Sequence, residues 1–139
     1  MNPINEIRKR LHNHPEVTLG EDRNYICAIP KSDEGFNVSL LNDGMGFTVT
    51  YGEGWHDHLV SSVDALNCFG FGLSDRCRLK TTLAGTFAYK WAVEYLEEEE
   101  WIEDSTTGLI FFPYWRKKHI FYKQNHIATK KQNEEWYAL

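Results

Sequence analysis

The sequence lacks the cysteine pattern of proteins that are held together by disulfides or by zinc. Its 139 residues include only Cys27, Cys68 and Cys77, and no two of them have the CxxC spacing of a zinc-ligand pair or a redox site. We therefore expect buried, unreactive thiols and a reducing compartment, which favours the cytoplasm.

Long apolar runs are missing too. No segment approaches the run of about 18 apolar residues that crosses a membrane. The charged stretch from Met1 to Leu11 is too polar for a signal peptide. The sequence therefore predicts a soluble protein that makes no contact with a membrane.

Positive charge is the third deficit. Lysine and arginine together number 15 against 20 aspartates and glutamates, which gives a formal net charge of -5. Because nucleic acids and anionic membranes bind basic surfaces, a nucleic-acid binder is disfavoured. The glycine-rich phosphate-binding pattern GxGxxG is absent as well, so no cofactor is expected.

What the chain does contain is enough apolar side chain for one globular domain, residues 1–139. Hydrophobic residues make up 42% of it and charged residues 25%, the composition of an ordinary folded protein. A chain of this length buries roughly two-thirds of the surface that it exposes when unfolded. No disulfide or metal is needed to stabilise such a core.

Three segments carry helix signals. Asn2 as N-cap with Pro3 at the first helical position predicts a short N-terminal helix. Ser61 three residues before Asp64 resembles a capping box and, with apolar residues at helical spacing, predicts the main helix over residues 62–71. A capping pattern further along the chain predicts a short, frayed C-terminal helix over about residues 130–137.

A first hairpin is predicted where two alternating apolar runs meet at Asp43 and Gly44. These two residues suit a two-residue turn with positive φ angles. The resulting register would pair Leu40 with Phe47 and place the apolar side chains of both strands on one face.

A second hairpin is predicted from residues 77–83 and 87–95, joined by a three-residue loop. This register would set Arg76 beside Glu94 and apolar side chains opposite one another. An acidic loop over residues 97–106 would follow, and then a third strand pair formed by residues 108–112 and 120–123.

Together these elements predict an α+β fold. An antiparallel sheet of six or seven strands would carry the main helix and the short N-terminal helix packed on one of its faces.

Two histidines precede the main helix, in a segment where loops often carry function. If residues 55–58 are extended, His56 and His58 point to the same side and, with Asp57, could serve a small enzyme or hold a metal. Two histidines do not close a metal shell, and no HExxH motif occurs. We therefore expect no bound metal and regard a solvated linker as the simpler interpretation.

Aromatic and basic residues gather in one segment, which Pro113 should push out of the sheet. A tryptophan beside an arginine is typical of interface hot spots, so these residues are the candidate binding site. They are Tyr114, Trp115, Arg116, Lys117 and Lys118. The alternative is that this basic loop pairs with the acidic one, within the molecule or across a homodimer.

The sequence alone does not establish a function. The lack of catalytic motifs favours a non-catalytic protein-binding module of the partner-masking or inhibitor type, which would use the aromatic and basic loop together with the acidic loop. An acidic protein surface, or a second copy of the chain, is the expected partner. The alternatives are a small enzyme with its site at Trp55 to His58, and an α+β protein that holds a small ligand in a cavity beneath residues 62–71.

Overall fold

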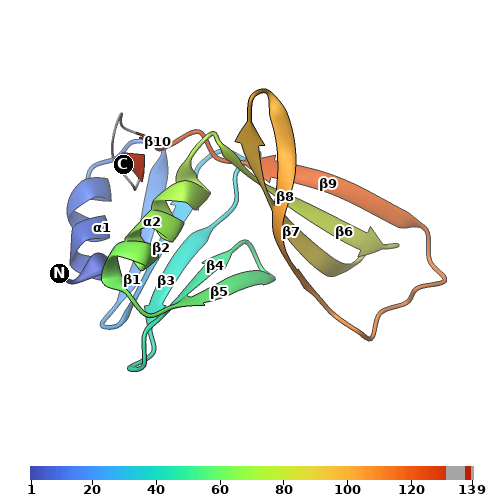
Figure 1. The fold of residues 1–139 in the computed structure, drawn as a ribbon, viewed down its shortest axis with the longest axis horizontal. Coiled ribbons are helices and arrows are strands. Elements are labelled where there is room, and N and C mark those ends of the chain that lie inside the picture. The colour runs from blue at the N-terminus through green and yellow to red at the C-terminus, as the bar shows by residue number, and fades with distance from the viewer. Residues whose placement is uncertain (131–136, 139) are drawn as a thin grey trace.

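The computed structural model describes residues 1–130, 137 and 138, which form two antiparallel sheets and two helices (Figure 1). The first sheet is a five-stranded meander in which each strand pairs with the next along the chain. Its strands are β1 (Val17–Asp22), β2 (Tyr25–Pro30), β3 (Val38–Asn42), β4 (Phe47–Tyr51) and β5 (Trp55–Leu59).

The second sheet has four strands in the order β8-β7-β6-β9. They are β6 (Cys77–Ala84), β7 (Phe87–Glu97), β8 (Glu100–Gly108) and β9 (Lys118–Gln124), and a short pair follows, β10 (Thr129–Lys130) with β11 (Tyr137–Ala138). The α+β class with antiparallel strands is confirmed, but the prediction of a single sheet with six or seven strands was wrong. Strands β1 and β5 were not recognised, because neither shows a long alternation of apolar residues.

The helices are α1 (Pro3–Leu11) and α2 (Ser62–Leu73). Their predicted caps are confirmed: the Asn2 side chain accepts from the backbone N–H groups of the first turn of α1, and the Ser61 hydroxyl accepts from that of Asp64. The two helices pack against each other and against the five-stranded sheet, and α2 also contacts β6 of the second sheet. The predicted packing of both helices on one large sheet therefore has to be corrected.

The first hairpin has a longer loop than predicted. Asn42 pairs with Phe47 and Leu40 with Val49, so the register is shifted by two residues from the predicted one. The loop is closed by a hydrogen bond of 3.1 Å from the Asp43 N–H to the Gly46 carbonyl. Because a shift of two preserves the alternation, the apolar side chains keep their predicted face.

The second hairpin and the segment after it also differ from the prediction. Strands β6 and β7 are joined by a two-residue turn at Gly85 and Thr86, with a register shift after Thr82. That shift sets Arg78, not Arg76, beside Glu94, at 2.5 Å between Nε and Oε1. A β-bulge of this kind is not visible in an alternation pattern.

The predicted acidic loop is a hairpin. Residues 100–108 form β8, which pairs with β7 through a tight turn at Glu98 and Glu99, both with positive φ. Residues 109–112 belong to no strand, and β9 pairs with β6 instead of with them. Residues 131–136, within the predicted C-terminal helix, lie outside the described residues, and the residues at its two ends belong to β10 and β11.

One continuous core joins the helices to both sheets. It runs from Ile7 and Leu11 of α1, through Tyr51 of β4, to Leu79 and Val93 of the second sheet. Within this core, the Trp55 indole stacks on Tyr51 at 4.3 Å, and its N–H donates to the Ser105 hydroxyl at 3.0 Å, which links β5 to β8. Within the described residues, neither helix is long and apolar enough to cross a membrane.

Candidate functional site

The segment between β8 and β9, residues 109–117, forms a long loop at the edge of the second sheet (Figure 1). It exposes large apolar side chains to solvent. We call this segment the β8–β9 loop. Ile110 and Phe111 are 88% and 90% exposed, and Tyr114 and Trp115 are 78% and 71% exposed. Burial of apolar surface is the main stabilising term in folding, so four such side chains left in water on one loop need a separate explanation.

The β8–β9 loop is anchored to the second sheet near both ends and in its middle. At its start, the Leu109 N–H donates to the Tyr89 carbonyl at 2.7 Å, and at its end the Lys117 carbonyl accepts from the Gly85 N–H at 2.7 Å. Between these points the Phe112 ring stacks on Tyr89 with centroids 3.9 Å apart. The exposed side chains are thus presented from a loop that the sheet holds in place.

Gly85 makes room for the end of the loop. Its φ of +63° lies in the left-handed region, and a Cβ there would come within 2.8 Å of Cδ of Arg116. A larger residue would therefore be strained and would also push Arg116 away. The β6–β7 turn and the β8–β9 loop are fitted to each other at this point.

The basic residues of the segment are exposed and point to no acidic partner. No ion pair in residues 1–130 includes Arg116, Lys117 or Lys118. The acidic turn at Glu98 and Glu99 lies at the opposite end of β8 from the β8–β9 loop (Figure 1). A strand of this length separates its two ends by roughly 25 to 30 Å. Among the described residues, no ion pair joins the basic segment to the acidic residues 97–106.

The histidine segment is strand β5 rather than a linker. His56 and His58 lie on one side of it, with ring centroids 6.0 Å apart, and by alternation Asp57 lies on the other side. The three candidate catalytic side chains therefore do not converge. In the described part of the chain, no group of three or more histidine, cysteine, aspartate or glutamate side chains is placed to hold a metal ion.

His58 has different neighbours from those that the sequence suggested. Its Nδ1 lies 2.9 Å from the Thr48 hydroxyl and 3.9 Å from Oδ2 of Asp43. A catalytic relay needs an acid on one ring nitrogen and a nucleophile on the other. Here both groups approach the same nitrogen, so the cluster does not have the geometry of a relay.

The three thiols are poor nucleophiles. Cys27 and Cys77 are buried and Cys68 is partly buried. Burial raises the pKa of the Cys68 thiol to about 12, and it raises the pKa of Cys77 well above its usual value. A thiol of this kind stays protonated at neutral pH, and the protonated form does not attack.

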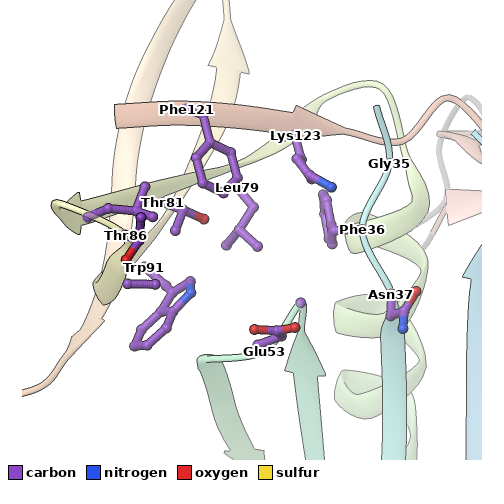
Figure 2. A pocket seen from close by; sticks show the side chains of 13 residues that line it. Gly35, Phe36, Asn37, Glu53, Leu79, Thr81, Thr86, Trp91, Phe121 and Lys123 are labelled. Atoms are coloured by element: carbon purple, nitrogen blue, oxygen red, sulfur yellow. The ribbon is translucent and has the colours of Figure 1, made fainter. Parts of the chain in front are cut away.

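A cleft lies between the two sheets, and no local pattern of residues indicates it (Figure 2). Its volume is about 410 Å³. Its walls include Leu79, Trp91, Phe121 and Lys123 of the second sheet, Phe36 from the segment before β3, and Glu53 from the turn between β4 and β5. It lies between the sheets and not beneath α2, where the cavity alternative placed a ligand. These residues come from positions 36 to 123 of the sequence. They become neighbours only when the strands pair in the registers that the structure shows.

The β8–β9 loop, the cleft and the β5 histidines are the candidate sites of this chain. In comparisons with known proteins, no family model, no curated protein and no solved structure matches the chain.

Proposed function

We propose that the protein is a non-catalytic binding module that docks on another protein through the β8–β9 loop. The observation that carries the proposal is the exposure of Ile110, Phe111, Tyr114 and Trp115 on a loop that is anchored by the backbone of Leu109 and Lys117 and by the ring of Phe112. Exposed apolar patches on folded proteins mark sites of interaction.

Anchoring matters because binding has an entropic cost. A loop that is ordered only when the partner arrives loses conformational freedom, and this loss weakens the complex. The stacking of Phe112 on Tyr89 and the hydrogen bonds at both ends remove much of that cost in advance. Tyr114 and Trp115, with ring centroids 5.4 Å apart, then supply rigid aromatic area.

The charges at the end of the loop select the kind of partner. Arg116, Lys117 and Lys118 follow Trp115 directly, are exposed and have no ion-pair partner among the described residues. An acidic protein surface with an apolar recess would satisfy both the basic and the aromatic groups. The net charge of -5 of the whole chain opposes the approach of a polyanion such as nucleic acid.

The experiment compares capture of partners from a native extract by the wild type, by the double variant Trp115→Ala with Arg116→Ala, and by a matched control. The control is Tyr25→Ala with Arg23→Ala, which removes an exposed arginine from the turn between β1 and β2 and an exposed aromatic residue at the start of β2. The captured protein is then purified, and its affinity is measured at low and high salt.

We expect the loop variant to bind this partner at least roughly tenfold more weakly than the wild type and the control. Added salt should weaken the wild-type complex, because charged groups steer it. Sedimentation of the purified protein shows whether the partner is a second copy of the chain. Unchanged affinity of the loop variant would refute the proposal, as would a loss of binding that merely follows a loss of folding.

A further inference from the structure

We propose that the cleft between the two sheets binds a small zwitterion with an apolar body, such as a free aromatic amino acid. This site is separate from the β8–β9 loop, and the inference does not depend on the function proposed for that loop.

The charged groups of the cleft come from opposite walls. Lys123 extends from β9 and Glu53 from the turn between β4 and β5, and both border the open space between the sheets (Figure 2). Neither takes part in any ion pair of the described residues. A purely anionic ligand would meet repulsion from Glu53, and a purely cationic one from Lys123. A ligand that carries both charges satisfies both side chains.

Beside these charges, apolar and aromatic side chains form much of the rest of the lining, together with the polar side chains of Asn37, Thr81 and Thr86. Trp91, Phe121 and Phe36 present rings to the cleft, and Leu79 forms part of its floor (Figure 2). Aromatic side chains bind other rings by stacking or by edge-to-face contact. The volume of about 410 Å³ falls within the range of roughly 300 to 1,000 Å³ that is typical of small-molecule sites.

Glycines in the β4–β5 turn hold the walls of the cleft in contact with each other. Gly52 has a φ of +62°, and a Cβ there would come within 2.8 Å of Cδ2 of Leu79. Gly54 lies directly on the Trp91 ring and leaves no room for a Cβ. The turn therefore fixes Trp91 and Leu79 while Glu53, between the two glycines, stays at the rim. A site that is formed before the ligand arrives binds it with less loss of entropy.

The test uses L-phenylalanine as the probe with ¹⁵N-labelled full-length protein at neutral pH. N-acetylphenylalanine removes the positive charge of the probe, and phenylalanine amide removes the negative one. Lys123→Met and Glu53→Gln remove the two charges of the cleft. Lys90→Met and Glu103→Gln are matched controls, because both residues are exposed in the second sheet and neither lines the cleft.

We expect saturable shifts of the amide signals of cleft residues such as Leu79 and Trp91. Loss of either charge, from the protein or from the probe, should weaken binding roughly tenfold, because each change removes a hydrogen bond between charged groups. The two controls should bind as the wild type does. The proposal is wrong if no saturable shift occurs at about 10 mM probe, or if N-acetylphenylalanine and the amide bind as well as phenylalanine itself.

Discussion

The side-chain amide of Asn125 forms a reciprocal pair of hydrogen bonds with the backbone of Phe36, 89 positions away in the chain. Its Oδ1 accepts from the Phe36 N–H at 3.1 Å, and its Nδ2 donates to the Phe36 carbonyl at 3.0 Å. The same Nδ2 also donates to the Gly72 carbonyl at 2.9 Å. One buried side chain therefore connects the end of β9, the segment that leads into β3, and the C-terminal turn of α2.

Asn125→Ala should lower the free energy of unfolding by about 3 kcal/mol. The change leaves three backbone groups without their partner in a buried place, and each such loss costs about 1 to 3 kcal/mol, less where the site relaxes or water enters. Urea denaturation followed by circular dichroism measures the effect. Asn37→Ala is the control, since Asn37 is exposed at the rim of the cleft, and it should change stability by less than about 0.5 kcal/mol. Equal stabilities of the two variants would show that Asn125 does not join the sheets.

Local signals in the sequence predicted α1 and α2 correctly but not a C-terminal helix, whose two end residues lie in β10 and β11, and the predicted long-range registers were wrong. The caps at Asn2 and Ser61 act on neighbouring residues only, so a single sequence is enough to find them. The first hairpin was misread because its loop has its own side-chain hydrogen bonds, from the Gly44 N–H to Asn42 and from the Met45 N–H to Asp43. These bonds stabilise a four-residue loop over the two-residue turn that the glycine suggested.

Of the candidate sites, too, the one built from contiguous residues could be predicted from the sequence, and the one built from distant residues could not. The β8–β9 loop could be found because its aromatic and basic residues are contiguous, and because Pro113 lacks the N–H that a central strand needs. The cleft could not be found from the sequence, because Phe36, Trp91 and Lys123 become neighbours only after the two sheets form and pack together. Their meeting depends on the bulge in β6 and on the close approach of Gly54 to Trp91, which no local pattern encodes.

Gly44→Val should destabilise the protein by about 1 kcal/mol or more through backbone strain alone. The φ of Gly44 is +88°, where a β-branched residue is strained, and nothing lies within 4 Å of the place that a Cβ would take. Gly44→Asn is the matched control, because asparagine tolerates positive φ, and it should cost clearly less. Thermal melting compares the two. Equal losses would point to a cause other than the backbone conformation.

The thiols should be protected from alkylation and should make the protein sensitive to alkali. Burial raises the pKa of the Cys68 thiol from 9.0 to about 12, so between these values the unfolded chain loses the proton while the folded chain keeps it. The stabilisation is therefore complete below pH 9 and is lost as the pH rises toward 12, by up to about 1.4 kcal/mol per pH unit. Iodoacetamide at neutral pH should modify Cys68 and Cys77 far more slowly in the folded protein than in urea. Cys68→Ala should show a weaker loss of stability above pH 9, and an unchanged alkaline profile would contradict this origin.

Phe112 and Trp115 lie in the same loop and should respond to truncation in opposite ways. Phe112 stacks on Tyr89, so Phe112→Ala should lower the free energy of unfolding by about 1 to 2 kcal/mol and release the middle of the β8–β9 loop. Trp115 is 71% exposed, so Trp115→Ala should change stability by less than about 0.5 kcal/mol. Chymotrypsin, which cleaves beside aromatic residues, should cut the loop faster in Phe112→Ala than in the wild type, because a released loop fits the protease better.

Partner affinity separates the two roles further: Trp115→Ala should weaken binding by removing a contact, and Phe112→Ala by loosening the loop that presents it. If Trp115→Ala instead destabilises the fold as much as Phe112→Ala does, then Trp115 packs into the protein in solution and the loop is not an interface.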